Sequence, residues 1–298
     1  MRIDFQVTEE FDQKKVYNIL RGPMKLSDSL IKKLKKSDGI LLNGSSVRTI
    51  DMVKTGDILS VIISDSEETS ITPENIPISI IYEDDCFIAV DKPPHMVVHP
   101  SAGHQTGTLA QGVLWYFHKQ GLYTKIRPIN RLDRDTSGIV LIAKNAYVQD
   151  QLAKQMQKNQ VFKAYLGIVH GIFEPASGTI RLPIARKEGS TMERIIDSSG
   201  YDSITHYETI KTYTDISLVK FILETGRTHQ IRVHMAYIGH PVIGDKVYGG
   251  KQQKYSIEGQ VLHAKTLGFH HPTTGKYMEF TSQLPEYFIN LLKQLREA

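Results

Sequence analysis

The stretch RPINRLDRDTSGIVLIAK, from Arg127 to Lys144, constrains the fold more than any other part of the sequence. Its second half, 138–143, is a continuous apolar run rich in β-branched residues, which predicts a buried strand. Its first half places charged side chains directly before that strand, at positions 131, 133, 134 and 135. Charges beside a buried strand are costly unless they are paired or used. They therefore indicate either a turn capped by aspartate or a functional site.

Composition narrows the class of protein without settling it. The chain has 298 residues, enough for two domains or one large one. Its net charge of +4 and pI of about 8.9 are compatible with a nucleic-acid partner. The single cysteine, Cys86, excludes an intrachain disulfide. No apolar stretch approaches the roughly 18 residues of a membrane span, and the start carries no signal segment, so we expect a cytoplasmic protein that does not enter membranes.

The first 64 residues predict a small module with a basic helix. Ser27 is a good N-cap for a helix that ends near Gly39, with Leu30, Ile31 and Leu34 as its apolar stripe. The lysines on the other side are Lys32, Lys33, Lys35 and Lys36. Alone they would indicate a solvated helix face. A basic helix followed by ILLNG and a strand led by Gly-Asp, however, resembles an RNA-binding module (the αL motif) of some ribosomal proteins and RNA-modifying enzymes. That resemblance implies that the lysines contact phosphates.

The rest of the chain is predicted to be a linker and one large domain. Residues 65–77 are polar and contain two prolines, which is typical of a linker, and 78–298 would form the large domain. We expect a short helix over 14–21 and a mobile loop over 186–203. Further helices are predicted to be capped by Thr108, Asn145 and Thr228, and a tail helix to begin at Pro285.

Two features of the large domain suggest ligands, and each has an ordinary alternative. His95, His99 and His104 fall within ten residues, but no second cluster at ligand spacing accompanies them, so loop histidines are favoured over a metal site. Arg227 lies where a strand meets the helix predicted at Thr228. Its charge and the helix N-terminus suit an anion, either a phosphate or a carboxylate.

Taken in order, these pieces resemble the RluA-type pseudouridine synthases. The two most specific segments are RLDRDTSG at 131–138 and ETGRTHQIRVHMA at 224–236, which together carry the resemblance. The other matching segments are VDKPPHMVVHPS at 90–101, FKAYLGIVHG at 162–171, GDKVYGG at 244–250 and LHA at 262–264. The resemblance implies an α+β fold with a mixed, largely antiparallel sheet and flanking helices. It also implies a cofactor-free and metal-free enzyme that isomerises uridine in RNA.

The resemblance assigns roles to particular residues. It implies that Asp133 is the nucleophile, that Tyr165 packs on the base and is a candidate for proton transfer, and that Arg227 is the ion-pair partner of the aspartate. From the sequence alone, Tyr165 would be an ordinary strand residue. The resemblance further places a set of residues at the substrate: Arg131, Arg134, Lys163, His229 and Leu262. Asp135 is expected to serve the turn or an ion pair.

One position departs from the family, and other functions stay open. The family usually has histidine before RLD, whereas this chain has Asn130, which argues against proton transfer at that position. We expect a monomer that modifies ribosomal RNA, favoured by analogy, or transfer RNA. The alternatives are an RNA-binding or ribosome-assembly protein that does not catalyse, and a metal-dependent nuclease. The nuclease is disfavoured because the acidic residues are not grouped as metal ligands.

Overall fold

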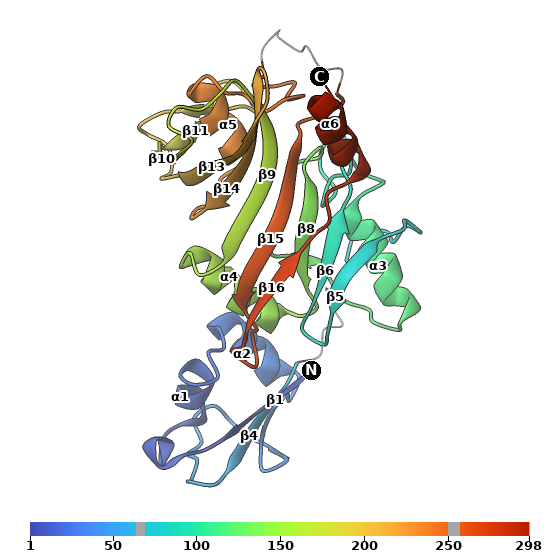
Figure 1. The fold of residues 1–298 in the computed structure, drawn as a ribbon. Coiled ribbons are helices and arrows are strands. Elements are labelled where there is room, and N and C mark those ends of the chain that lie inside the picture. Colours follow the sequence, from blue (N-terminus) through green and yellow to red (C-terminus); the bar gives the residue numbers. More distant parts are fainter. Residues whose placement is uncertain (64–68, 250–256, 298) are drawn as a thin grey trace.

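Two β-sheets organise the computed structural model, which describes residues 1–63, 69–249 and 257–297 (Figure 1). A four-stranded sheet has the order β1-β4-β2-β3, and a ten-stranded sheet has the order β10-β13-β14-β9-β15-β8-β6-β5, with β16 added to β15 and β7 to β8. Residues 65–68 of the predicted linker and Gly250 of the GDKVYGG segment lie outside the described residues.

The small sheet and its helices form a front module, residues 1–63. Its strands are β1 (Arg2–Gln6), β2 (Ile40–Leu42), β3 (Ser45–Ser46) and β4 (Ile58–Ile62). Its helices are the 3-10 turn η1 (Glu9–Phe11), α1 (Val16–Arg21) and α2 (Asp28–Lys36). Ser27 caps α2 by accepting a hydrogen bond from the Leu30 amide, and the predicted apolar stripe of this helix is buried. The helix predicted over 14–21 begins later, because Lys15 has an extended backbone.

The large sheet is antiparallel at every described strand pair but one. Its central strands are β5 (Ser79–Glu83), β6 (Phe87–Lys92), β7 (Arg127–Pro128), β8 (Ser137–Ala143), β9 (Phe162–His170), β15 (Leu262–His270) and β16 (Tyr277–Thr281). The outer strands are β10 (Ser177–Arg181), β13 (Ile204–Thr212) and β14 (Ile216–Leu223). The exception is β15, which runs parallel to β8. The mixed, largely antiparallel sheet expected from the sequence is confirmed.

Helices cover both faces of the large sheet. They are α3 (Leu109–Lys119), α4 (Ala146–Gln157), α5 (Gln230–Tyr237) and α6 (Glu286–Glu297). Strand β8 is buried along its whole length because its alternate side chains meet different helices. Ile139 and Leu141 share a core with α4, whereas Val140 and Ile142 share one with α3. The continuous apolar run predicted from the sequence is thus explained by burial on both faces.

Local signals predicted most helix starts. Thr108 makes a capping box with Gln111, and Asn145 caps α4 by accepting from the Val148 amide at 2.9 Å. Two predictions in this domain are wrong. The segment 186–203 is not simply a loop, because Arg194–Ile196 (β12) pairs with Ile184–Arg186 (β11) as a hairpin. The helix predicted to be capped by Thr228 begins at Gln230, with His229 as its N-cap.

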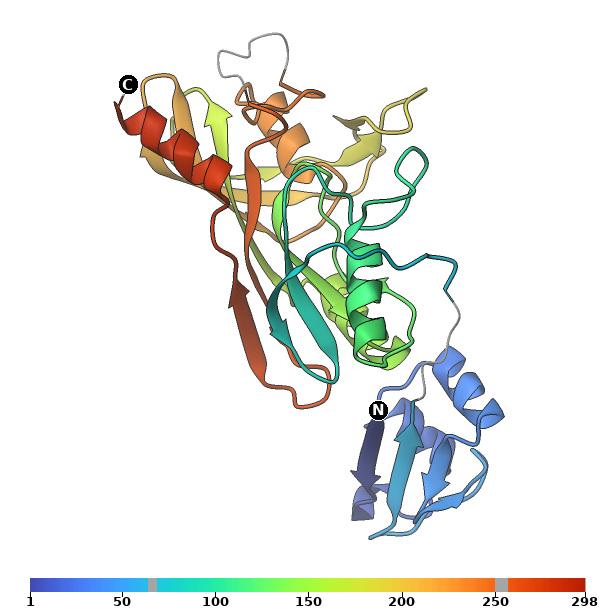
Figure 2. The ribbon, with the colours of Figure 1, turned by 90° about the vertical axis from the view of Figure 1, so that its right-hand side faces the viewer.

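The front module lies at one end of the large sheet in both ribbon views (Figures 1 and 2), and it contacts helix α4 there. The carbonyl of Lys25 accepts hydrogen bonds from Gln151 Nε2 at 2.9 Å and from Lys154 Nζ at 3.2 Å. Apolar residues of the module and of α4 also share one hydrophobic core. Within the predicted linker, the Glu74 carboxylate accepts from the Gln111 side chain and from a backbone amide before α3. This part of the linker therefore lies against the large domain.

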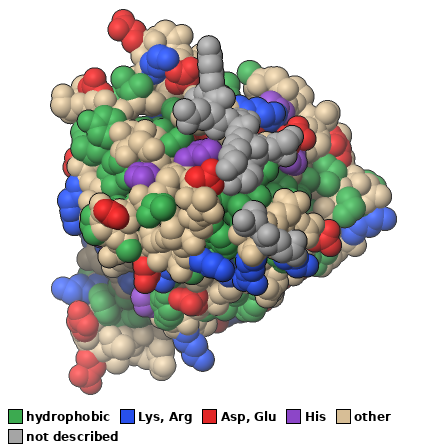
Figure 3. Space-filling model, turned by 45° about the horizontal axis from the view of Figure 1, so that its top comes forward, with side chains coloured by type: hydrophobic (Ala, Val, Ile, Leu, Met, Phe, Trp, Pro, Cys, Tyr) green, Lys and Arg blue, Asp and Glu red, His purple; other side chains and the backbone are tan. Residues whose placement is uncertain are grey.

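The surface and the helices give two further constraints. On the face drawn in Figure 3, cationic and anionic side chains are interspersed. None of the helices that the structure describes is both long and apolar enough to span a membrane.

Candidate active site

Asp133 lies in the turn between β7 and β8. Its carbonyl accepts a hydrogen bond from the Thr136 amide at 3.2 Å, which closes the turn. The following carbonyl, that of Arg134, accepts from the buried Nζ of Lys92 at 3.0 Å. Lys92 also donates to two carbonyls of the loop after β6, so one ammonium joins both loops. Burial lowers the pKa of Lys92 to about 7, although the nearby charge of Asp133 opposes this shift.

Asn130 fastens the other side of the same loop to strand β8. Its Nδ2 donates to the Ile139 carbonyl at 2.9 Å, and its Oδ1 accepts from the Leu141 amide at 2.8 Å. These are backbone-like hydrogen bonds that occupy both ends of the amide. The residue that departs from the family pattern thus holds the loop of Asp133 in place.

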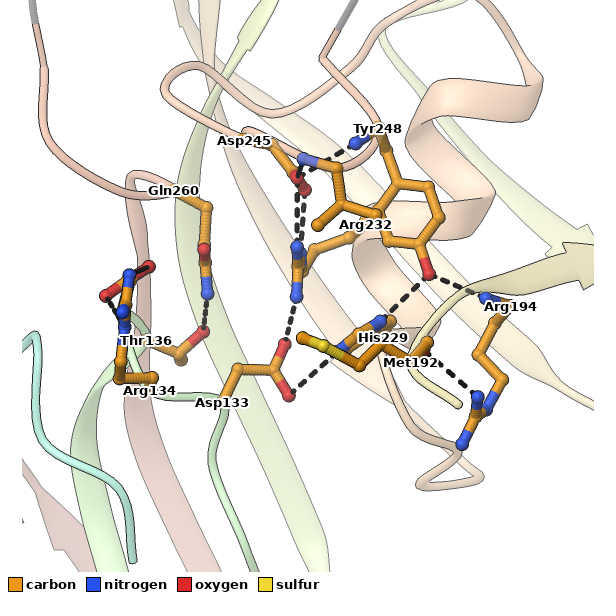
Figure 4. Close-up of polar contacts among 12 residues, drawn as sticks. Asp133, Arg134, Thr136, Met192, Arg194, His229, Arg232, Asp245, Tyr248 and Gln260 are labelled. Atoms are coloured by element: carbon orange, nitrogen blue, oxygen red, sulfur yellow. Dashed lines mark hydrogen bonds and ion pairs between the residues drawn. The ribbon is translucent and has the colours of Figure 1, made fainter. Parts of the chain in front are cut away.

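A buried arginine joins Asp133 to a second carboxylate (Figure 4). Arg232, in the first turn of α5, donates from Nη1 to Asp133 Oδ2 at 2.8 Å. Its Nε and Nη2 bind the two oxygens of Asp245 at 2.7 and 2.9 Å. Burial alone would raise the pKa of Asp245, but the hydrogen bonds and charge of Arg232 hold that pKa below its usual value. Asp245 therefore fixes the position of the Arg232 guanidinium and leaves its Nη1 to donate to Asp133.

A histidine approaches the other oxygen of Asp133. His229 Nε2 lies 3.7 Å from Asp133 Oδ1, and His229 Nδ1 lies 2.8 Å from the Tyr248 hydroxyl (Figure 4). The same hydroxyl accepts from the backbone amide of Arg194 at 2.8 Å. Burial lowers the pKa of His229, with the Asp133 charge opposing, so the ring favours its neutral form. His229 has a left-handed backbone, with φ of 59°, which is uncommon for a residue with a side chain.

Tyr165 and Lys163 stand on β9 beside this group. Burial raises the pKa of Tyr165, and the charge of Asp133 adds to the shift, so the phenol stays protonated. Lys163 Nζ donates to the Glu224 carbonyl at 3.2 Å. Burial lowers the pKa of Lys163 to about 8, and the charge of Arg227 contributes. Strand β9 thus contributes one phenol and one weakly basic amine to the site.

One cavity of about 730 Å³, a volume typical of pockets for small ligands, is lined by Asp133, Lys163, Tyr165 and His229. An adjoining hollow shares Asp133, Tyr165 and His229 and is closed by Leu262 and Arg232. The predicted residues at the larger cavity are Arg131, Asp133, Lys163, Tyr165, Arg227 and His229. Leu262 lines the smaller one. The structure therefore brings together seven of the eight residues predicted for catalysis and substrate binding.

The ion-pair partner predicted for Asp133 is wrong. Arg227 lies before α5 and is exposed; its Nε donates to the Asp202 carbonyl at 3.2 Å, and its guanidinium lies over the Tyr201 ring. Arg232 holds the carboxylate instead. Arg227 precedes α5, whereas the side chain of Arg232, within the helix, reaches the turn that carries Asp133.

Arg134 does not line either cavity, contrary to the prediction. Its guanidinium binds both oxygens of Asp135 at 2.8 and 3.1 Å, and His95 Nδ1 lies 3.0 Å from the same carboxylate. Asp135 thus serves an ion pair, as expected. Sequence reasoning missed Arg232, Asp245 and Tyr248, although the last two stand in a Gly-rich turn of the GDKVYGG segment.

A group of possible metal ligands lies away from this cavity. Among the described residues, Asp84, Cys86 and His271 offer ligand atoms within 4.8 Å of one another. Amides of the β15–β16 turn donate to His271 Nδ1, so its proton sits on Nε2, which lies 3.0 Å from Asp84. Burial also raises the pKa of the Cys86 thiol. These hydrogen bonds explain why the three side chains lie together at the end of the β15–β16 hairpin. The three side chains fit a metal ion poorly. His99, from the histidine group noted in the sequence, faces the Pro100 carbonyl at 3.3 Å.

Known proteins share both the sequence pattern and the fold. The chain matches the family model described as RNA pseudouridylate synthase over residues 86–237. A Bacillus subtilis protein named as an uncharacterized RNA pseudouridine synthase is 36% identical over 300 residues, which cover 99% of each chain. Ribosomal large subunit pseudouridine synthase D of Haemophilus influenzae is 35% identical over 258 residues, 83% of this chain and 79% of that protein. The solved structure of human RNA pseudouridylate synthase domain containing 4 has a TM-score of 0.62 at 21% identity and covers 73% of this chain and 93% of that one.

The structural likeness defines the fold as that of the pseudouridylate synthases. With relatives at this identity over most of its length, the chain belongs to the RNA pseudouridine synthase family, and its class of enzyme is an isomerase. The family, fold class and enzyme class predicted from the sequence are confirmed.

Proposed function

We propose that this protein isomerises specific uridines of large-subunit ribosomal RNA to pseudouridine, with Asp133 as the nucleophile. The observation that carries the proposal is the Asp133 carboxylate paired with Arg232 beside Tyr165 in one cavity. The choice of RNA is supported by relatives that are named as ribosomal large subunit pseudouridine synthase D.

The reaction requires an ionised carboxylate in a partly dry site. Burial penalises the charged form of a carboxyl group, and a cation in contact favours it. Arg232 supplies that cation to Asp133, and its two hydrogen bonds to Asp245 hold the guanidinium in place. In the proposed reaction the bond from ribose to ring nitrogen breaks, the base turns, and a new bond forms from ribose to ring carbon 5. The hydrogen on carbon 5 leaves as a proton and the ring nitrogen gains one, so no electrons are exchanged.

The substrate base must leave its stack to reach Asp133. Enzymes that act on bases extrude the nucleotide and hold it against aromatic or apolar side chains. Tyr165 and Leu262 supply such surfaces next to the carboxylate. The cations Arg131, Lys163 and Arg227 line the cavity and suit the phosphates on either side of the flipped nucleotide.

The front module supplies a second proposed contact with RNA. Lys32, Lys35 and Lys36 are exposed on α2, and Lys33 is half-buried. Phosphate contacts of this kind position RNA without reading its sequence. Helix α4 contacts the module, and its C-terminal end also lines the cavity, which supports the proposal that one RNA contacts both.

The test is release of tritium from ribosomal RNA labelled at carbon 5 of uridine, with RNA taken from cells that lack the protein. The parent protein should release tritium, and Asp133→Asn should not. Asp85→Asn is the matched control, because it removes an exposed aspartate in the turn between β5 and β6. Turnover by Asp133→Asn at the rate of the parent protein would disprove the proposal.

The remaining outcomes separate the alternatives. Release from transfer RNA but not ribosomal RNA would retain the chemistry and overturn the substrate. RNA binding without release from either would favour the non-catalytic RNA-binding protein. The Asp133–Arg232 pair argues against that function, since a protein that only binds RNA has no need of a carboxylate held by a buried arginine in its cavity.

A further inference from the structure

The Tyr248 hydroxyl lies at the centre of a series of polar contacts that ends at Asp133. It accepts a hydrogen bond from the Arg194 amide of strand β12 at 2.8 Å. It also lies 2.8 Å from His229 Nδ1, and the opposite nitrogen of that ring faces Asp133 Oδ1 at 3.7 Å. These contacts thus lead from the β11–β12 hairpin through the phenol of Tyr248 and the imidazole of His229 to the carboxylate of Asp133 (Figure 4).

The pattern of donors assigns the tautomer of His229. The Arg194 amide can only donate, so the Tyr248 oxygen accepts there, and its own proton is free for His229 Nδ1. The single proton of the neutral ring then sits on Nε2, where it meets the negative charge of Asp133. The other tautomer would aim a lone pair at that carboxylate. Both considerations favour the Nε2–H form.

We propose that Tyr248 is a positioning residue that holds His229 as a neutral Nε2–H donor toward Asp133. The Oδ2 atom of Asp133 would then be paired with Arg232, and its Oδ1 atom would face the Nε2–H group of His229. The separation of 3.7 Å is longer than a hydrogen bond, and contacts of this kind commonly tighten when substrate binds. The effect on catalysis rests on the proposed role of Asp133 as the nucleophile. The assignment of the Nε2–H tautomer does not depend on that role.

Loss of the Tyr248 hydroxyl should change the ionisation of His229 in a defined direction. An O–H donor to Nδ1 stabilises the neutral ring, because a protonated Nδ1 cannot accept that bond. In Tyr248→Phe the ring should therefore take up a proton at higher pH than in the parent protein. The resulting imidazolium would pair with Asp133 and weaken it as a nucleophile. The charged and titratable groups that face His229 are Asp133, Arg194, Arg232, Asp245 and Tyr248.

The first test is nuclear magnetic resonance of protein labelled with ¹⁵N in histidine, which needs no RNA and no turnover. His229→Gln identifies the His229 signals by their loss. In the parent protein they should show a neutral ring protonated at Nε2. In Tyr248→Phe the titration midpoint should rise by at least about one pH unit. An Nδ1–H ring in the parent, or an unchanged midpoint in Tyr248→Phe, would overturn the proposal.

The second test compares tritium release across pH. The kcat of Tyr248→Phe should fall below that of the parent at acidic pH and recover toward it at alkaline pH, with KM nearly unchanged. Tyr277→Phe is the matched control, because its exposed hydroxyl bonds Glu279 on β16 far along the sheet. A uniform loss of kcat at every pH would indicate a merely structural role and would also overturn the proposal. If the parent modifies no RNA, the proposed function fails, and the resonance experiment still decides the tautomer.

Discussion

Arg232 and Asp133 form an ion pair at 2.8 Å, between a side chain in the first turn of α5 and a turn 99 residues earlier in the chain. The arginine is almost completely buried, whereas the carboxylate keeps a quarter of its side chain exposed. The cation is thus part of the framework, and the anion is the partner that a substrate can reach.

Replacement of Arg232 by lysine should reduce kcat strongly. Lysine keeps the charge but is a single donor centre, so it cannot hold both oxygens of Asp245 and also reach Asp133. We expect kcat to fall by about 10²-fold, comparable to the loss of one oriented donor in other active sites. Tritium release measures it, with Arg296→Lys on the exposed face of α6 as control. A parent-like kcat in Arg232→Lys would show that Asp133 does not depend on this pair.

Arg227 should behave differently from Arg232. It is exposed at the cavity, over the ring of Tyr201, and the structure gives it no contact with Asp133. Arg227→Ala should therefore raise KM for RNA and leave kcat within a few-fold of the parent. Binding and turnover measured at several salt concentrations check this, because a lost phosphate contact also reduces the salt dependence of binding. If Arg227→Ala lost as much kcat as Arg232→Lys, the assignment of the two arginines would be reversed.

The contrast between these arginines shows where sequence reasoning ends. The strand at 138–143 and the caps Ser27, Thr108 and Asn145 were predictable because their signals are local. Which arginine meets Asp133 depends on how α5 packs against the turn before β8, which lies 99 residues earlier in the chain. The left-handed backbone of His229 also makes α5 begin at Gln230, one residue later than a cap at Thr228 predicts, and nothing in the local pattern specifies it.

The partners of the site were equally beyond local reasoning. Asp245 and Tyr248 stand in a turn that the sequence marks only as Gly-rich. Their role depends on Arg232 and His229, which a different element supplies. The pairing of β15 with β8 likewise joins segments more than a hundred residues apart. Such contacts follow from the packed fold as a whole.

Gly138 should be irreplaceable at the parallel junction of β8 and β15. Its φ is +109°, and a Cβ there would lie 2.3 Å from the carbonyl oxygen of Ala264. Gly138→Ala should therefore lower the free energy of unfolding by more than about 3 kcal/mol, through backbone strain and overlap together. Gly275→Ala is the matched control, because that glycine also has a positive φ but open space around it; about 1 kcal/mol is expected. Equal losses in urea titrations would mean that the close approach to Ala264 is relieved at little cost.

Lys92 should contribute a pH dependence to the free energy of unfolding, and replacement of Lys92 should abolish that contribution. Burial lowers its pKa in the folded protein from 10.5 to about 7. Between these values the unfolded chain binds a proton that the folded protein lacks, so the free energy of unfolding should rise with pH, by up to about 1.4 kcal/mol per unit. Lys92→Met lacks this rise of the unfolding free energy with pH, and it also loses the hydrogen bonds to the loop carbonyls.

The measurement is urea unfolding of the parent and of Lys92→Met between pH 7 and pH 9. Other titrating groups are common to both proteins, so the difference between the two unfolding free energies isolates Lys92. That difference should grow as pH rises. Lys293→Met, on the exposed side of α6, should show no such trend. A difference independent of pH would mean that Lys92 stays charged in the folded protein, its ammonium stabilised by the three carbonyls and by the nearby Asp133.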